Sequence, residues 1–143
     1  MRVVGLDVGE RRIGVAVSDA TRTLARPVTV LQIARLDAAA VTRAADEIGR
    51  IAAEDDPVGA IVVGLPRRLD GRPTTLTEAV QTFASALGAR TKLPVAFQDE
   101  RLTSVEAESR LAGRDKDWRS RKKRLDAAAA AIILQDHLDG LPR

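Results

Sequence analysis

Cysteine is absent from this sequence, and histidine occurs once, at His137. The chain can therefore form neither a disulfide nor a thiolate metal site, and it cannot assemble a multi-histidine cluster. A bound metal would have to be held by carboxylates. Aromatic residues make up only 2% of the chain, so its core must be filled by Val, Ile, Leu and Ala side chains. Such a core is typical of the packed helices and strands of an α/β protein.

Long apolar runs are missing as well, because no stretch approaches the roughly 18 residues that a transmembrane helix needs. A strand-like pattern begins at the first residues. We therefore expect a cytoplasmic protein that does not contact a membrane. The 143 residues, 45% of them hydrophobic, predict a single domain over residues 1–143, and the formal charge of +3 mildly favours a polyanionic partner.

The order of the predicted elements indicates the fold class. β-rich runs predict strands at residues 3–8, 13–17, 28–33, 58–65 and 93–98. Helical spacing predicts a helix after Asp37, one from the capping-box pattern at residues 75–78 to Gly88, one at residues 103–113, and one from about Asp126 to Leu138. This order predicts an α/β fold with a mixed five-stranded sheet, in which a three-stranded antiparallel ribbon joins two parallel strands and helices flank the sheet.

That element order is the ribonuclease H-like one. A doubly wound nucleotide-binding fold is the rival, but it would alternate strands and helices from the start and carry a glycine-rich first turn into a helix. Here the first turn, residues 9–12, leads into a second strand.

Asp7 is the first candidate for chemistry. It shares one face of its strand with Val3 and Gly5, so it projects from the interior of a hydrophobic strand. An ionised carboxylate there needs a cation or several hydrogen bonds. The alternative role is a turn carboxylate bonded to the amides of Gly9 and Glu10.

Glu100 and Asp126 are the second and third candidates. Glu100 follows the carboxyl end of a predicted parallel strand, where sites in open α/β sheets lie, although position alone does not separate it from Asp99 and it could simply pair with Arg101. Asp126 precedes the run of alanines at 127–131, whose small side chains would let the helix approach the sheet. Its alternative role is to complement the helix dipole.

Together the three carboxylates can form an oxygen-rich site suited to Mg²⁺ or Mn²⁺. Two such ions, about 4 Å apart, can activate a water for in-line attack on a phosphate and stabilise the leaving oxygen. No histidine or serine nucleophile is then needed. The sequence therefore predicts metal-dependent cleavage of phosphodiester bonds.

Residues 114–124 carry seven basic residues against two acidic ones and contain the only tryptophan, Trp118. Trp118 could stack on an unpaired base, and non-specific phosphate contacts could come from Arg121, Lys122, Lys123 and Arg124. The alternative is a solvated charged loop with Trp118 against the core.

A second basic pair, Arg67 and Arg68, follows the fourth predicted strand and could also approach phosphates, although exposed arginines are just as common. His137, near the end of the last helix, is expected to be a helix-end or surface residue rather than a catalyst.

Four blocks of this sequence resemble the signatures of the bacterial YqgF (RuvX) family. The first block is GLDVGERRIGVAVSD at residues 5–19. The second is VGLP at 63–66 with Asp70 and Gly71, and the third is DERLTS at 99–104 with Ala107 and Glu108. The fourth comprises Lys123, Asp126, Ala129 and the ILQ of residues 133–135.

The resemblance implies a ribonuclease H-like nuclease similar to RuvC-type Holliday-junction resolvases, with a role in processing the 5′ end of the 16S ribosomal RNA precursor. The family's acidic triad falls on Asp7, Glu100 and Asp126, which favours Glu100 over Asp99. Other family positions, expected to shape the site or contact substrate, fall on Arg12, Asp19, Arg101, Thr103 and Lys123. RuvC-type enzymes have a further acidic residue on the last helix, where this chain has only alanines at 127–131.

We therefore expect a Mg²⁺- or Mn²⁺-dependent endonuclease, with two ions when substrate is bound, that acts on precursor ribosomal RNA and leaves a 5′-phosphate and a 3′-hydroxyl. One alternative is a resolvase of four-way DNA junctions, which would usually need a homodimer with two sites. The other is a non-catalytic nucleic-acid-binding factor in transcription or ribosome assembly.

Overall fold

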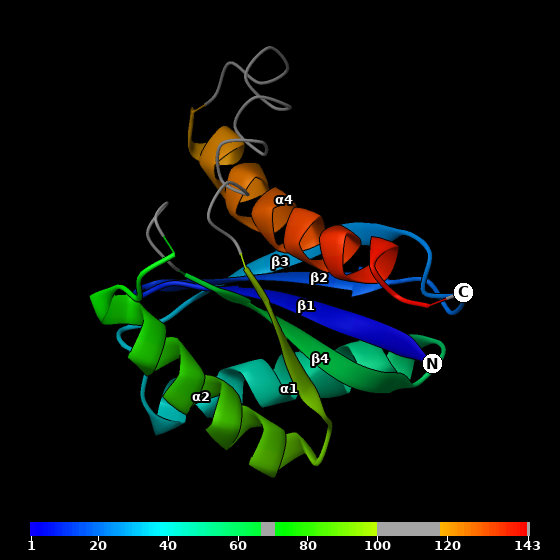
Figure 1. Ribbon diagram of the computed structural model, residues 1–143, viewed down its shortest axis with the longest axis horizontal. Coiled ribbons are helices and arrows are strands. Elements are labelled where there is room, and N and C mark those ends of the chain that lie inside the picture. Colours follow the sequence, from blue (N-terminus) through cyan, green and yellow to red (C-terminus); the bar gives the residue numbers. More distant parts are fainter. Residues whose placement is uncertain (67–70, 100–117, 143) are drawn as a thin grey trace.

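Five strands form one mixed sheet against which helices pack (Figure 1). The computed structural model describes residues 1–66, 71–99 and 118–142, with only the backbone described at 118–126. The strands are β1 (Arg2–Val8), β2 (Arg12–Ser18), β3 (Ala25–Gln32), β4 (Val58–Leu65) and β5 (Val95–Asp99). The helices are α1 (Ala38–Glu54), α2 (Thr75–Thr91) and α4 (Trp118–Asp139).

The strand order in the sheet is β3-β2-β1-β4-β5. β1 pairs antiparallel with β2, and β2 pairs antiparallel with β3. β1 also pairs parallel with β4, and β4 pairs parallel with β5. The predicted antiparallel ribbon and parallel pair are therefore confirmed, with β1 as the central strand that belongs to both.

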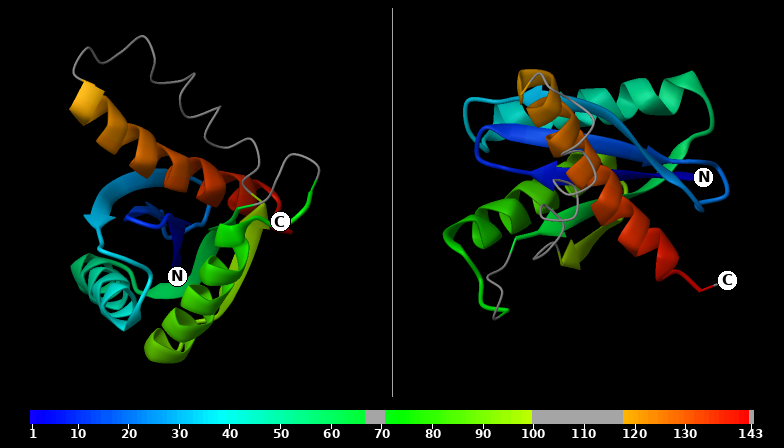
Figure 2. Two further views of the ribbon diagram at one scale, coloured as in Figure 1. Left: turned by 90° about the vertical axis from the view of Figure 1, so that its left-hand side faces the viewer. Right: turned by 90° about the horizontal axis from the view of Figure 1, so that it is seen from above.

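Alternate residues of β1 face two different cores. Val4, Leu6 and Val8 are buried in the core that α1 and α2 cover, whereas Val3 is buried in a second core with residues of α4. Figure 2 shows α1 and α2 on one side of the sheet and α4 on the other. By the same alternation Asp7 lies on the α4 face together with Val3, and the sequence pattern predicts that these two residues share a face.

Side chains close both ends of α1. Asp37 caps its start as predicted, because the Asp37 Oδ1 accepts a 3.0 Å hydrogen bond from the backbone N–H of Ala40. At the other end the buried guanidinium of Arg2 donates to the carbonyls of Ile51 at 2.7 Å and Asp56 at 2.8 Å. These bonds satisfy carbonyls at the end of the helix and attach α1 to the start of β1.

β3 starts three residues earlier than the predicted strand at 28–33. The predicted start at residue 28, directly after Pro27, was wrong. A proline cannot donate to a ladder, but β3 is an edge strand, and the register shifts between Val15 and Ala16, opposite Pro27.

The predicted start and end of α2 were also displaced. The N-cap is Thr74 rather than Thr75, and the Thr77 hydroxyl, not Glu78, completes the capping box. Thr77 is buried and donates to the carbonyl of Pro66, which ties the helix to the end of β4. The helix continues past Gly88, where a Cβ would lie 3.0 Å from Val95, so this glycine makes room for β5 and does not end the helix.

α4 begins at Trp118, eight residues before its predicted start at Asp126. The prediction began the helix only after the basic segment, yet Arg and Lys are good helix formers and extend a helix that packing stabilises further along. The basic residues at 119–124 are thus helical. Their turns continue past the edge of the sheet in Figure 1. The predicted helix at 103–113 lies outside the described residues.

Within the described ranges, no helix combines the length and apolar character that crossing a membrane requires.

α4 packs closely against β1 at Gly5. A Cβ built on Gly5 would lie 2.7 Å from the Cβ of Leu134 and 3.2 Å from the carbonyl oxygen of Ala130. The first distance is shorter than real Cβ contacts, and both neighbours belong to the packed part of the helix. The absence of a side chain at residue 5 therefore sets how closely α4 lies on the sheet.

We predict that Gly5→Ala destabilises the fold by about 1–3 kcal/mol, because the helix or the strand must shift to admit the methyl group. Gly49→Ala is the matched control, since Gly49 lies exposed within α1 and its Cβ would meet nothing within 4 Å. That change should stabilise by about 0.5–1 kcal/mol through helix propensity. Urea unfolding of both variants measures the difference, and a Gly5→Ala protein as stable as wild type would contradict the close-packing account.

Candidate functional site

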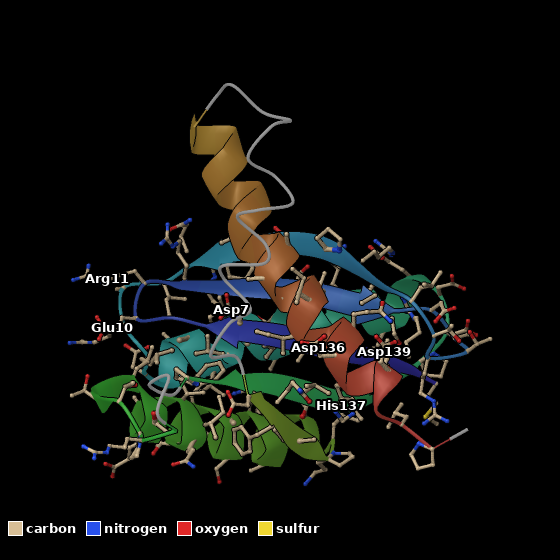
Figure 3. The ribbon with its side chains drawn as sticks, turned by 45° about the horizontal axis from the view of Figure 1, so that its top comes forward. Asp7, Glu10, Arg11, Asp136, His137 and Asp139 are labelled. Atoms are coloured by element: carbon tan, nitrogen blue, oxygen red, sulfur yellow. The ribbon has the colours of Figure 1, made fainter. Side chains whose placement is uncertain are left out.

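Asp7 lies at the carboxyl end of β1, half-buried on the α4 face of the sheet. It lines a pocket of about 320 Å³ with the first hairpin turn, including Glu10, Arg11 and Arg12. Figure 3 shows Asp7 at the same end of the sheet as Glu10 and Arg11. A carboxylate in such a cleft can bind a cation that also contacts a ligand from solvent.

Glycines surround Asp7 on its face of the sheet. Gly14 of β2 is its direct cross-strand partner. On β4, Leu6 pairs with Val63, so the next residue, Gly64, lies beside Asp7 on the other flank. Gly14 and Gly64 thus form a glycine floor beside Asp7. The sequence did not predict this floor, because each glycine comes from a different strand and only the register brings them together. Neither glycine adds a side chain beside Asp7 on this face of the sheet.

Arg12 shares the α4 face with Asp7, because Gly14, two residues further along β2, is the partner of Asp7. The hairpin that carries it is fixed by a 2.8 Å hydrogen bond from the N–H of Gly9 to the carbonyl of Arg12, and by a 3.0 Å bond from the N–H of Ile33 to the carbonyl of Arg11. The structure therefore brings the guanidinium-bearing residue Arg12 and Asp7 into one pocket.

Asp99 lies on the opposite face of the sheet from Asp7. Phe97 pairs with Val63, which is buried in the α1–α2 core, so alternation puts Gln98 on the α4 face and Asp99 on the α1–α2 face. β5 runs parallel to β4 and β1, so its carboxyl end reaches the same edge as Asp7. Glu100 follows immediately, outside the described residues.

Most of the other predicted site residues are not described in full. Arg67, Arg68, Arg101 and Thr103 lie outside the described residues. Backbone positions alone are described for Trp118, Arg121, Lys122, Lys123, Arg124 and Asp126, all within α4. Since Asp7 is the one predicted ligand with a described side chain, the described part of the chain contains no group of three or more metal-binding side chains.

Asp19 lies far from Asp7. It follows β2, five residues beyond the Gly14 that pairs with Asp7, or about 17 Å along the strand. Its carboxylate accepts hydrogen bonds from the N–H of Thr23 at 2.8 Å, the hydroxyl of Thr21 at 2.7 Å and the N–H of Leu24 at 3.2 Å. These bonds, led by that of Thr23, lower the pKa of Asp19 to about 2. Asp19 thus organises the turn between β2 and β3.

Gln135 is a second polar residue whose contacts the sequence did not predict, and it belongs to α4. Its side chain bonds to the backbone of Thr23 and Ala25 in and after the same turn. Its partners are more than a hundred residues away, and no local pattern indicates them.

His137 lies in the last turn of α4, and Figure 3 shows it with Asp136 and Asp139 at the other end of the sheet from Asp7. Partial burial lowers the pKa of His137, so the ring is mostly neutral at pH 7. Its position agrees with the prediction of a helix-end residue.

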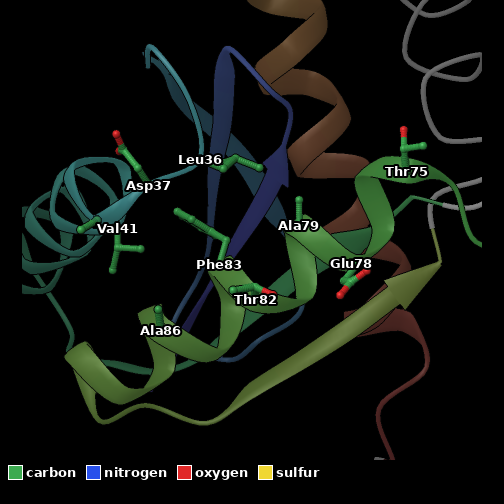
Figure 4. A pocket seen from close by; sticks show the side chains of 10 residues that line it. Leu36, Asp37, Val41, Thr75, Glu78, Ala79, Thr82, Phe83 and Ala86 are labelled. Atoms are coloured by element: carbon green, nitrogen blue, oxygen red, sulfur yellow. The ribbon is translucent and has the colours of Figure 1, made fainter.

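A separate hollow lies between α1 and α2, on the face of the sheet away from Asp7 (Figure 4). Apolar side chains such as Val41 and Phe83 line it, with Asp37 and Glu78 at its margin. The Asp37 carboxylate is already engaged as the cap of α1, and its bond from the N–H of Ala40 lowers its pKa. This hollow therefore brings together none of the residues that the sequence predicts for the site.

Several known proteins resemble this chain. A sequence profile of the RuvX family, described as "Holliday junction resolvase", matches residues 1–140. A Chloroflexus aggregans protein named "Putative pre-16S rRNA nuclease" is 44% identical over 137 residues, covering 96% of this chain and 92% of the relative.

Two solved structures share the fold. The T. thermophilus RuvC in complex with a Holliday junction substrate has a TM-score of 0.53 at 19% identity, with 93% of this chain and 91% of that chain covered. The fowlpox virus Holliday junction resolvase has a TM-score of 0.56 at 11% identity, with 99% of this chain and 100% of that chain covered. The fold is therefore ribonuclease H-like, as the element order predicted.

The lowered pKa of Asp19 predicts a pH-dependent contribution to stability. Because the folded protein favours the carboxylate, this stabilisation is complete above the ordinary pKa of about 4 and is lost as the pH falls towards about 2. Asp19→Asn, which resembles the protonated acid, should melt at a lower temperature than wild type at pH 6. Melting curves from pH 6 to pH 2 should show that gap closing below pH 4; a gap that stays constant would contradict the prediction.

Proposed function

The chain belongs to the RuvX family, and from that premise we propose that it is a metal-dependent endonuclease that processes the 5′ end of precursor 16S ribosomal RNA. The observation that carries the proposal is the setting of Asp7, a half-buried carboxylate at the carboxyl end of the central strand, beside a glycine floor and under the helix that carries Asp126. The name of the C. aggregans relative supports the RNA substrate.

Glu100 is the second ligand that we propose, in preference to Asp99. Alternation places Gln98 on the same face as Asp7 and Asp99 on the other. A chain that continued in extended form for one more residue would return Glu100 to the Asp7 face. Two strand spacings, about 10 Å, separate the backbones of β1 and β5, and the length of a glutamate helps to cover that distance.

Asp126 is the third proposed ligand. Ala130 of α4 lies over Gly5, and Asp126 is one helical turn, about 6 Å, before Ala130. Asp7 is two residues, about 7 Å, beyond Gly5 along β1. In Figures 1 and 2 the last turns of α4 lie towards the start of β1, so both steps lead in the same direction. Steps of similar length from the contact of Ala130 with Gly5 support the pairing of Asp126 with Asp7.

The donor set suits Mg²⁺ or Mn²⁺, which prefer oxygen ligands, and we propose that Asp7, Glu100 and Asp126 hold two such ions with substrate bound. Bound there, divalent ions supply Lewis-acid activation of the attacking water and charge stabilisation of the leaving oxygen. The part of the protein is to fix three carboxylates at one edge and to keep the space above Gly14 and Gly64 open for the phosphate backbone.

Basic residues supply the affinity in this proposal. Arg12 lines the pocket of Asp7, and the first turns of α4 carry five basic residues between 119 and 124, beyond the edge of the sheet. Their phosphate contacts would hold a nucleic acid across the site without reading its sequence. Trp118 at the start of α4 would stack on an unpaired base. Arg67, Arg68, Arg101 and Thr103 complete the proposed contact set.

Resolution of four-way DNA junctions is the second candidate, because the family description and both structural relatives refer to Holliday junctions. It would require a homodimer with two sites. The alanines at 127–131 stand where RuvC-type enzymes have a further acidic residue, which weighs against junction resolution by direct analogy. Incubation of precursor RNA and of a four-way junction with Mn²⁺, Mg²⁺ or chelator separates the two candidates.

We predict that Asp7→Asn, Glu100→Gln and Asp126→Asn each reduce metal-dependent cleavage of precursor RNA by at least about a hundredfold, because each removes a charged ligand. Asp99→Asn is the matched control for Glu100, since Asp99 faces the other side of the sheet. Asp46→Asn, on the exposed side of α1, is the control for Asp7. Both controls should cleave like wild type in single-turnover assays.

Two outcomes would contradict this assignment. If Asp99→Asn lost as much cleavage activity as Glu100→Gln, the choice of Glu100 over Asp99 from the faces of β5 would be wrong. Full complementation of a depleted strain by Asp7→Asn combined with Asp126→Asn would favour instead a non-catalytic nucleic-acid-binding factor.

Replacement of the basic cluster of α4 should weaken RNA binding and flatten its salt dependence. We expect the slope of log K against log salt to fall by up to about 0.7 for each phosphate of single-stranded RNA that the variant no longer neutralises. The variant is the fourfold alanine replacement of Arg121, Lys122, Lys123 and Arg124. The charge-matched control replaces the exposed Arg35, Arg43, Arg50 and Arg90. If both variants change the slope equally, general charge and not this cluster determines binding.

A further inference from the structure

Gln135 makes directional contacts that join α4 to the sheet. Its Oε1 accepts a 2.9 Å hydrogen bond from the N–H of Ala25, and its Nε2 donates at 2.9 Å to the carbonyl of Thr23. The same Nε2 donates at 2.9 Å to Oδ1 of Asp139, one turn further along α4, which holds the amide in this orientation. The side chain therefore pairs with the β2–β3 turn as a neighbouring strand would.

The turn that receives Gln135 is itself held in one conformation. The N–H of Asp19 donates to the carbonyl of Leu24 at 3.1 Å, and the Asp19 carboxylate accepts from the N–H groups of Thr23 and Leu24. Arg22 occupies the left-handed region with φ of 56°, which closes the turn. Asp19 thus fixes the backbone groups to which Gln135 bonds.

The hydrophobic contacts of α4 with the sheet lack direction. Ala130, Ile133, Leu134 and Leu138 pack on the side chains of Val3, Ala16 and Val62. Apolar contacts of this kind permit small rotations and slides, because they depend on buried area and not on angle. Gly5 sets the separation of the helix from the sheet, whereas the bonds of Gln135 set its rotation and its position along the axis.

A small change in the orientation of α4 at Gln135 produces a larger displacement at the proposed metal site. Asp126 lies nine residues before Gln135 in one continuous helix, or about 13 Å along its axis. If the axis of α4 tilted by about 5° with Gln135 as the pivot, Asp126 would move by about 1 Å. Displacements of that size are enough to reduce catalysis by about a hundredfold.

We propose that Gln135, held by the Asp19 turn, is a positioning residue that sets the place of Asp126 relative to Asp7. This inference rests on the proposed function. It also explains why Asp19, at the far end of β2 from Asp7, occupies a position that matches the family signature: it acts on the site through Gln135 and the length of α4.

The kinetic test uses Gln135→Met, which keeps the length of the side chain and removes the amide. We expect kcat with Mn²⁺ to fall by about ten- to a hundredfold and the Mn²⁺ concentration for half-maximal activity to rise. Gln135→Asn keeps the amide on a shorter chain and should lose part of the activity, so the inference stays testable if the Met variant does not fold. Ile48→Val, buried in α1 on the other face, is the control for a general loss of stability.

The structural test does not depend on catalysis. Because the chain has no cysteine, spin labels on Glu10→Cys and Arg119→Cys report the distance between the Asp7 turn and the first turn of α4. Pulsed EPR should show a shifted or broadened distance distribution in Gln135→Met and an unchanged one in Ile48→Val.

The two proposals fail in different ways. If the wild type shows no metal-dependent cleavage, the proposed function fails, while the EPR result still decides whether Gln135 positions α4. If the wild type cleaves and Gln135→Met changes neither the distance distribution nor the Mn²⁺ dependence, the positioning role is overturned. Loss of activity with an unchanged distance distribution would overturn it as well.

Discussion

The packing of α4 on β1 at Gly5 is the contact on which the geometry of this chain's proposed site depends. Leu134 and the carbonyl of Ala130 reach the backbone of the central strand only because residue 5 has no side chain. On the other face, Val4, Leu6 and Val8 fix β1 against α1 and α2. Any added bulk at residue 5 is therefore transmitted to α4, and the helix carries Asp126 and the basic cluster with it.

Periodicity within single elements was enough to predict much of the fold. β4 has the predicted bounds, since its apolar run lies between Pro57 and Pro66. The alternation of β1 placed Asp7 on the face that α4 covers. The predictions failed where the deciding contact is distant in sequence: the start of α2 depends on Thr77 reaching Pro66, and β3 tolerates Pro27 because it is an edge strand.

In the candidate site, too, the sequence predicted features within single elements but not those that depend on pairing between strands. The choice between Asp99 and Glu100 was open from position in the sequence, and the family resemblance alone favoured Glu100. The register of β5 against β4 adds an independent argument, because it puts Asp99 on the α1–α2 face. Gly14 and Gly64 were passed over, since a glycine in a strand has no pattern of its own and its role beside Asp7 follows from pairing between strands.

The proposed site and the hydrogen bonds that anchor α4 lie at opposite ends of the sheet. At the carboxyl end of β1, the half-buried Asp7 lines the pocket of the first hairpin turn, and Gly14 and Gly64 flank it on the neighbouring strands. At the other end, Asp19, Thr23, Ala25 and Gln135 satisfy one another in a closed set of hydrogen bonds. An apolar helix face lined with alanine can lie close to a sheet but has little to fix its angle. A rigid helix transmits orientation along its length. The hydrogen bonds of Gln135 at one end of α4 can therefore orient Asp126 at the other end without occupying the proposed site.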